Sequence, residues 1–418
     1  MATEKLYWAD PFATTFEATA RLGELGGKRT VVLDRTLFYP EAGGQLADLG
    51  SLTLGAATLR VDDVQIDDAG DIHHLIASAP ADAGALAGPV RGVIDADRRR
   101  DHMAQHTGQH ALSRALVDVA RADTVSSRLG ATSCTIDVEG ALDERDVAKA
   151  EDLVNSVVMS DVPVRQLFPT ADELATMPLR RAPKVATGVR VIDIQGFDLS
   201  PCGGTHCTRS GQIGVVRVVG LEKYKGGWRV TFHAGRRALD DARRKEAVLA
   251  DLARDFTCGM LDVGGAVGKL RAELKARLDA LSATRGELVE LVAERVLAAH
   301  PPDPSGTTRI VLVRPHDDVG MLRTLAGRLA ARADVVAFCA APDASAGGTG
   351  KGGGDSEPAL TVVVQRGAGA SFDCGAWLKG VAAAHGGRGG GRPERAEGRL
   401  PAGPGGPSLE MLASGQAG

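Results

Sequence analysis

The chain has 418 residues, a length that predicts two to four domains at roughly 150 residues per domain. Its 49 Lys and Arg against 53 Asp and Glu give a formal net charge of −4, which excludes a polycation that coats nucleic acid and an acidic disordered chain. The sequence begins without a basic segment followed by an apolar one, and its six cysteines show no compact spacing. These features predict a cytoplasmic protein with reduced thiols and no membrane segment.

Residues 1–90 contain short β-type runs separated by Gly-Gly and Asp-rich turns, and no helical period there exceeds two turns. This pattern predicts an N-terminal β-barrel module. The runs are Phe16–Leu22, Thr30–Leu33, Leu52–Val61 and Ile72–Ile76.

Residues 91–237 mix helical and strand patterns, which predicts an α+β domain. We expect Asp97 to cap a helix that runs to about Ala120, and a second helix over Asp143–Met159. The expected strands are Thr135–Val138, Val162–Leu167, Gly188–Ile194, Ile213–Leu221 and Trp228–Ala234.

Residues 238–300 form a long helical region interrupted at Cys258–Gly265. Its leucines lie three, four or seven residues apart among charged residues, which predicts a helical hairpin or a coiled-coil seam. Two ordinary surface helices of one domain are the alternative. The leucine-rich helices also favour a homodimer that forms through this region.

Residues 305–400 are expected to form a small α/β domain, followed by a disordered tail over 401–418. A Gly-rich insert, Ala346–Pro358, is expected to be a mobile loop between two of its strands. The expected elements are the strands Arg309–Val313, Val335–Ala340 and Ala359–Val364 and the helix Val319–Ala331.

Three histidines, His102, His106 and His110, are spaced four residues apart on the first expected helix, and this spacing places them on one side of it. Two imidazoles one turn apart can reach the same metal ion, but all three span ~12 Å at a rise of 1.5 Å per residue, too far for one ion. Either His102 with His106 or His106 with His110 would therefore serve. A polar helix face without a metal is the alternative interpretation.

A second group, Cys-Gly-Gly-Thr-His, occupies residues 202–206. Two glycines between a cysteine and a histidine permit a tight turn that brings both side chains to one point. A thiolate together with imidazoles suits Zn²⁺, whereas a glycine turn around a buried cysteine would need no metal. The two groups together favour a metal site.

The paired motifs HTGQH (106–110) and CGGTH (202–206) resemble those of the editing domain of alanyl-tRNA synthetase and of its free-standing relatives, the AlaX proteins. The sequence departs from the family pattern at Ser127 and Arg128, and at Ala42 and Leu46 in a Gly-rich segment. Further segments similar to the family are 35–50, 124–140, 221–239 and 385–398, the last resembling the Gly-rich signature of the synthetase's C-terminal domain.

The resemblance implies one Zn²⁺ per chain held by four residues, and leaves His102 as a neighbour. It also implies an N-terminal β-barrel, a two-layer α+β editing domain of the synthetase second-additional-domain type, helices and a C-terminal synthetase-like domain. No P-loop or aminoacylation domain is recognisable in the sequence, so the resemblance implies the long free-standing form, without ATP binding. The implied ligands are His106, His110, Cys202 and His206.

The implied activity is hydrolysis of tRNA(Ala) mischarged with serine or glycine, which preserves the fidelity of translation. Zinc could lower the pKa of a bound water or orient the aminoacyl group, although four protein ligands leave no free tetrahedral position. A polar partner for the serine hydroxyl would discriminate serine from alanine, and Thr36, Gln45 and Ser126 are candidates by position. The other expected pocket residues are Gly130, Gly203, Gly204 and Thr205.

Binding of tRNA requires cationic side chains that contact phosphates. Each basic run could instead be an ordinary solvated face, and a tRNA-binding module with a structural zinc is the alternative function. A phosphoesterase related through the C-terminal segment is disfavoured, because no Asp-His-His motif precedes that segment. The expected contacts are Arg98, Arg99, Arg100, Lys223, Lys225, Arg388 and Arg392, with Arg229, Arg395 and Arg399 beside them.

Overall fold

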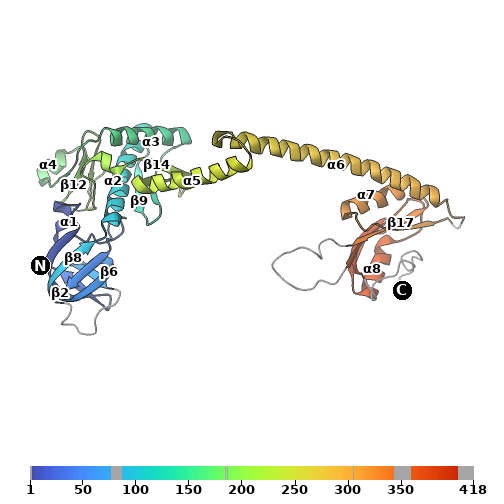
Figure 1. The fold of residues 1–418 in the computed structure, drawn as a ribbon, viewed down its shortest axis with the longest axis horizontal. Helices are drawn as coiled ribbons and strands as arrows, with labels where there is room; N and C mark the ends of the chain where they lie inside the picture. The colour runs from blue at the N-terminus through green and yellow to red at the C-terminus, as the bar shows by residue number, and fades with distance from the viewer. Residues whose placement is uncertain are drawn as a thin grey trace. The chain divides into compact units, whose positions relative to one another are not determined.

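A computed structural model describes residues 2–76, 87–183, 185, 187–304, 306–342 and 359–402 of the chain. The chain divides into two compact units, Met1–Asp255 and Phe256–Gly418, whose elements Figure 1 labels. The predicted Gly-rich loop at 346–358 lies outside the described residues, and so does the predicted tail beyond residue 402.

Six strands of the first unit close into a barrel in the order β2-β3-β7-β6-β5-β8 (Figure 1). Alternate side chains along β2, including Phe16 and Ala18, are buried, because every second residue of a strand points into the barrel interior. A Cβ on Gly92 would lie 2.2 Å from the ring of Phe16, and this position therefore requires glycine. The strands are β2 (Thr15–Leu25), β3 (Lys28–Leu33), β5 (Gly50–Leu54), β6 (Ala57–Ile66), β7 (Ile72–Ile76) and β8 (Gly88–Ile94).

The predicted N-terminal barrel is confirmed, with two differences in its strands. The predicted run Leu52–Val61 is the hairpin β5–β6, because Gly55 turns the chain with a φ of 56°. The barrel also needs β8, which pairs with β2 and β5 and ends at Ile94, beyond the expected boundary at residue 90. Pro89 and Gly92 give that segment a weak strand signal, so only its pairing identifies it.

The rest of the first unit packs two helices, α2 (Ala96–Ala120) and α3 (Glu144–Met159), on a four-stranded sheet of order β14-β15-β10-β9. The side chain of Asp95, not the predicted Asp97, caps α2 by accepting hydrogen bonds from the backbone N–H groups of Asp97 and Arg98. The strands are β9 (Thr124–Leu129), β10 (Cys134–Val138), β14 (Val216–Tyr224) and β15 (Gly227–Ala234).

A three-stranded antiparallel sheet, ordered β11-β12-β13, leads directly into the CGGTH loop. Its last strand was not predicted. The predicted strand Ile213–Leu221 begins only at Val216, because Ser210–Ile213 forms a 3₁₀ turn that Gly214 ends with a φ of 69°. The sheet comprises β11 (Val164–Leu167), β12 (Val191–Ile194) and β13 (Asp198–Pro201); the short elements are β1 (Glu4–Lys5), α1 (Leu6–Ala9), β4 (Arg35–Thr36) and α4 (Ala171–Thr176).

Two long helices occupy the predicted helical region: α5 (Gly235–Asp255) ends the first unit, and α6 (Val263–Ala299) begins within the second. Their pairing as a hairpin remains a prediction. The α6 leucines that are predicted to form the seam are 45% to 65% exposed within the second unit. No helix within the described ranges is long and apolar enough to cross a membrane. The seam leucines are Leu270, Leu274, Leu278, Leu281, Leu288 and Leu291.

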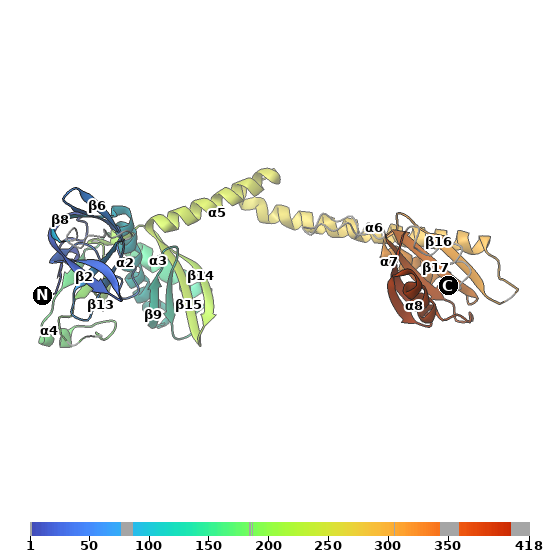
Figure 2. The ribbon, with the colours of Figure 1, turned by 90° about the horizontal axis from the view of Figure 1, so that it is seen from below.

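The second unit is built on a five-stranded sheet of order β16-β17-β18-β20-β19, in which β16 and β17 run parallel (Figure 2). Val336 and Phe338 of β17 pack in one apolar cluster with α8, while Val335 and Ala337 pack in another with α7 and the end of α6. The predicted α+β class is thus confirmed, although α8, β19 and β20 were not predicted. The elements are β16 (Thr308–Val313), α7 (Val319–Leu329), β17 (Val335–Pro342), β18 (Ala359–Arg366), α8 (Cys374–His385), β19 (Arg388–Arg392) and β20 (Arg395–Pro401).

Candidate metal centre

Helix α2 and the loop after β13 bring four metal-binding side chains together, and their ligand atoms all lie within 4.8 Å of one another. The Sγ of Cys202 lies 3.3 Å from Nε2 of His106 and 3.3 Å from Nε2 of His206. Nε2 of His110 is buried and has no hydrogen-bond partner in the protein. Thiolate and imidazole donors that converge in this way could hold a metal ion.

The structure selects His106 and His110 from the two histidine pairs that the spacing left open. His102 lies outside the ligand group, although it is buried and its Nδ1 has no partner. Burial, reinforced by Arg98, lowers the pKa of His102 to about 4, so this side chain is neutral at physiological pH.

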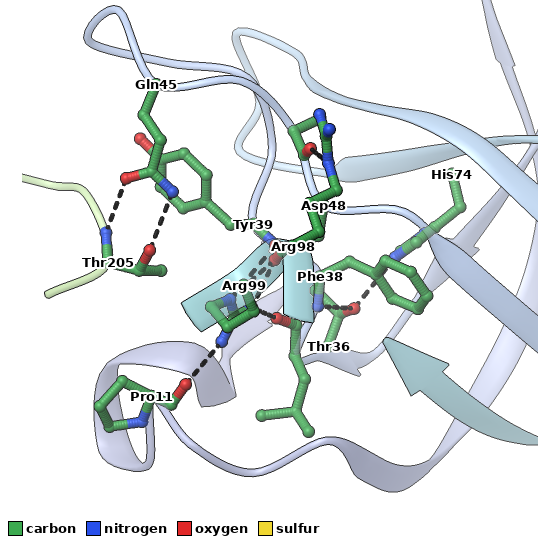
Figure 3. A network of polar contacts seen from close by, with 12 residues as sticks. Pro11, Thr36, Phe38, Tyr39, Gln45, Asp48, His74, Arg98, Arg99 and Thr205 are labelled. Carbon is green, nitrogen blue, oxygen red and sulfur yellow. Dashed lines mark hydrogen bonds and ion pairs between the residues drawn. The ribbon is translucent and has the colours of Figure 1, made fainter. Parts of the chain in front are cut away.

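The Nδ1 atom of each ligand histidine faces an acceptor. Gln45 uses its amide nitrogen to donate to Thr205 (2.8 Å), so its Oε1 accepts from Nδ1 of His106 at 2.7 Å. Thr107 donates its hydroxyl proton to a backbone carbonyl, so its oxygen accepts from Nδ1 of His206 at 3.2 Å. Figure 3 shows Gln45 joined to Thr205.

The carboxylate of Asp198 lies beside the third histidine without a hydrogen bond to it, with its Oδ2 at 3.4 Å from Nδ1 of His110. Arg180 donates to the other oxygen of Asp198 at 2.7 Å and fixes the carboxylate. A histidine whose Nδ1–H is held by an acceptor presents its Nε2 lone pair to a metal. His106 and His206 are therefore in the tautomer that a metal ion requires, whereas His110 makes an ion-pair contact with Asp198 but no hydrogen bond from either ring nitrogen.

The electrostatics of the group favour the ligating form of Cys202, His106 and His206. Burial alone would raise the pKa of Cys202, but the three neighbouring imidazoles lower it well below its usual value, which favours the thiolate. Burial lowers the pKa of His106 and of His206, which favours neutral imidazole. Burial would also lower the pKa of His110, but Cys202 and Asp198 raise it. The residues present therefore fit a metal of the zinc type.

The CGGTH loop is held by contacts that reach its backbone from distant parts of the chain. Nη1 of Arg190 donates to the carbonyls of Cys202 (2.9 Å) and Gly204 (2.8 Å). A Cβ on Gly204 would lie 2.2 Å from the ring of His106, so a larger residue cannot occupy this position. Sequence patterns gave no signal for Arg190, because nothing in its local sequence marks it as a partner of residues 202–204.

Two predicted pocket residues, Thr36 and Gln45, form hydrogen bonds within the protein. Thr36 is fully buried, and its hydroxyl contacts Nε2 of His74 and the backbone N–H of Phe38, so it is not free for a substrate (Figure 3). The side-chain amide of Gln45 is hydrogen-bonded to His106 and to Thr205. Both residues position the protein's own groups.

The other predicted pocket residues are placed as follows. Ser126 on β9 donates to Asp137 at 2.8 Å and keeps its oxygen lone pairs. The carbonyl of Gly130 accepts from Arg237 at 2.7 Å. Gly203 and Thr205 lie in the ligand loop, and the hydroxyl of Thr205 is bonded to Gln45.

Two of the three arginines at the start of α2 form contacts within the protein. Arg99 is 1% exposed and pairs with the buried carboxylate of Asp48, while its Nη1 donates to the Pro11 carbonyl at 3.0 Å (Figure 3). Arg98 donates to the Ala47 carbonyl at 2.9 Å and is partly buried. Arg100 is the member of the run that remains exposed.

The remaining predicted cations lie on surfaces. Lys223 and Lys225, both exposed, stand over the rings of Trp228 (5.7 Å) and Tyr224 (5.2 Å) and help to line a hollow of about 540 Å³ at the tip of the β14–β15 hairpin. The other predicted contacts, Arg388 and Arg392, are exposed on β19 of the second unit.

Comparison with known proteins relates this site to tRNA synthetases. Residues 189–231, which contain Cys202 and His206, match the family described as threonyl and alanyl tRNA synthetase second additional domain. Residues 13–98 match the family of class II (A) tRNA synthetases. Cys202 and His206 thus lie in a segment similar to the second additional domain of threonyl and alanyl tRNA synthetases, while His106 and His110 lie between the two matched segments.

Individual relatives agree with this assignment. The alanine–tRNA ligase of Halorubrum lacusprofundi is 32% identical over 322 residues, which cover 74% of this chain and 34% of that protein. The enzyme of Thermofilum pendens is 35% identical over 247 residues, which cover 57% of this chain and 27% of that protein. The chain therefore spans about a third of the length of the curated relatives it matches.

One solved structure is also similar, the C-Ala domain from Aquifex aeolicus alanyl-tRNA synthetase. It is 21% identical, with a TM-score of 0.22, and the match covers 27% of this chain and 93% of that one.

Proposed function

We propose that the protein is a zinc-dependent hydrolase that removes serine, and also glycine, from mischarged tRNA(Ala) in the cytoplasm. The observation that carries the proposal is the group of four converging donors, in a chain related to alanine–tRNA ligases. Residues 91–237 would be the editing domain, 305–400 a synthetase-like C-terminal domain, and the helices over 238–300 a dimer contact.

The protein's own residues would prepare this site before a substrate arrives. When bound, zinc would supply a Lewis acid that polarises the ester carbonyl or grips the aminoacyl group. Gln45 fixes His106 and Thr205 together, and Arg190 fixes the backbone of the loop, so the donors need little reorganisation. Ser126 has lone pairs available to accept a hydrogen bond from a serine hydroxyl.

Phosphate contacts would come from cations that the structure leaves exposed. In the first unit these are Arg100, Lys223 and Lys225. In the second unit they are Arg388 and Arg392, at either end of β19. These residues would bind tRNA without regard to the attached amino acid, whereas the metal centre would distinguish the ester.

A structural zinc in a tRNA-binding module is the second candidate. Its support is that four protein ligands complete a tetrahedron, as in structural zinc sites, and that three of the four are buried. This candidate predicts tRNA binding that depends on zinc for folding and no cleavage of any ester.

A deacylation assay tests the proposal. Zinc-loaded protein is mixed with Ser-tRNA(Ala), Gly-tRNA(Ala) and Ala-tRNA(Ala), and release of each amino acid is followed against a buffer control. We expect faster release of serine and glycine than of alanine. If no ester is cleaved faster than in buffer while tRNA still binds, the structural alternative replaces the proposal.

A further inference from the structure

The short helix α1 is attached directly to the ligand loop. The indole N–H of Trp8 donates to the carbonyl of Gly203 at 3.0 Å, between the ligands Cys202 and His206. The backbone carbonyl of Trp8 accepts in turn from the side-chain amide of Gln166. Trp8 is thus held beside the ligand loop by its indole N–H and by its backbone carbonyl.

Aromatic and cationic side chains surround this indole. The ring of Phe168 lies 6.1 Å from the Trp8 ring at an angle of 54°, and Phe168 is 59% exposed. Nζ of Lys5 lies 4.6 Å from the centre of the indole ring, and the guanidinium of Arg190 lies 5.5 Å from it. We name Lys5, Trp8 and Phe168 the Trp8 platform.

The Trp8 platform has an uncompensated positive charge. In the described part of the chain no carboxylate forms an ion pair with Lys5, whereas the charge of Arg190 is partly balanced by the nearby Cys202. Burial lowers the pKa of Lys5, as expected for a cation that has lost part of its water without gaining an anion. An anionic ligand would restore that balance.

We infer that the Trp8 platform binds the 3′-terminal nucleotide of the tRNA, with its base stacked on the exposed ring of Phe168 and its phosphate near Lys5. The inference rests on the proposed function and extends it from the ester to the nucleotide that carries the ester. Only a ribose separates the ester from the base, so a base site must lie close to an ester site. Aromatic rings beside a cation are the combination that binds unpaired nucleotides.

The expected effect is on binding of substrate and not on the chemical step. Phe168→Ala removes one stacking surface, which predicts a KM for Ser-tRNA(Ala) about tenfold higher, with kcat and zinc content unchanged. Lys5→Met should also raise KM and reduce its dependence on salt. Met159→Ala, at a residue 78% exposed on α3, is the matched control and should change nothing.

A second measurement does not depend on hydrolysis. In a zinc-loaded protein carrying Trp228→Phe and Trp377→Phe, Trp8 is the one remaining tryptophan, and adenosine 5′-monophosphate should quench its fluorescence. Phe168→Ala and Lys5→Met should weaken that quenching. The inference is overturned if the nucleotide does not quench Trp8, or if both platform variants behave like Met159→Ala.

The two measurements separate this inference from the proposed function. If the unaltered protein cleaves the ester but Phe168→Ala and Lys5→Met change neither KM nor quenching, the nucleotide site is contradicted and the proposed hydrolase is not. Quenching that needs Phe168 and Lys5, in a protein that cleaves no ester, contradicts the proposed hydrolase and leaves the nucleotide site standing.

Discussion

The two units of the chain differ in what they bury. Among the described residues, every buried polar or charged side chain except Thr308 belongs to the first unit. The second unit instead packs aliphatic and aromatic side chains on both faces of one sheet. A buried polar group left without a partner costs about 1–3 kcal/mol, so a unit rich in such groups depends on partners for most of them. Ring nitrogens of His102, His110 and His233 are the ones left without a hydrogen-bond partner in the described part of the first unit.

This difference indicates that the metal-binding group and the polar contacts around it belong to the first unit. In the first unit, Gln45 and Thr107 each accept a hydrogen bond from a ligand histidine, and Asp198 lies beside the third, so folding and metal binding depend on the same contacts. The second unit has no comparable group within its described residues, and its cations lie on the surface. Loss of metal or of a buried charge should therefore affect the first unit only.

Removal of a ligand should give the largest effect. Cys202→Ala should abolish stoichiometric zinc binding and increase amide hydrogen exchange along α2, because three imidazoles then converge without a thiolate. Exchange in α7 and α8 should stay the same. Cys339→Ala, a buried cysteine of the second unit, is the control and should keep the metal. Equal zinc content in both variants would contradict the site.

The buried ion pair should give the next largest effect. Arg99→Met leaves Asp48 charged and unpaired, and should lower the free energy of unfolding by about 3–5 kcal/mol in urea denaturation. The matched change in the second unit, Arg323→Met, breaks the more exposed pair with Glu397 and should cost about 1 kcal/mol or less. Similar costs for the two variants would remove the contrast between the units.

The acceptors behind the histidines should have an intermediate effect. Asp198→Ala removes the carboxylate 3.4 Å from Nδ1 of His110 and should weaken zinc affinity about 10- to 100-fold, measured by competition with a chromophoric chelator. Asp334→Ala, at a carboxylate of the second unit that pairs with Arg332, should leave zinc affinity unchanged. An unaltered affinity in Asp198→Ala would show that this carboxylate does not position the ligand.

A single phosphate contact should give the smallest effect. Lys225→Ala should weaken tRNA binding a few-fold and reduce the slope of log affinity against log salt by about 0.7–0.9. Arg388→Ala gives the corresponding measurement for the second unit. A slope reduced in one variant only would assign the phosphate contacts to one unit.

The ligand group could be predicted because its chemistry is local. His106 and His110 are one helical turn apart, and Cys202 and His206 flank a glycine turn, so each half of the site is visible in a short segment. The acceptors could not be predicted in the same way. Gln45 is 61 residues from His106, and only the packing of the barrel on α2 brings them together.

The environments of the three arginines at 98–100 could not be predicted, although the residues are adjacent in the sequence. Successive residues on a helix point about 100° apart, so three adjacent arginines cannot share one environment. The rotation of α2 places Arg99 against Asp48 in the interior and leaves Arg100 in solvent. The sequence of three arginines alone does not reveal this difference. The predicted helix cap, Asp97, also lies two residues after the observed cap, Asp95.

The central claim is that the buried donor group of the first unit performs ester hydrolysis, and one comparison tests it most directly. Single-turnover deacylation of Ser-tRNA(Ala) is measured with the zinc-loaded protein and with Cys202→Ala, at concentrations where both bind tRNA equally. We predict rapid release of serine by the unaltered protein and release at the buffer rate by Cys202→Ala. Equal rates in the two proteins would contradict the account.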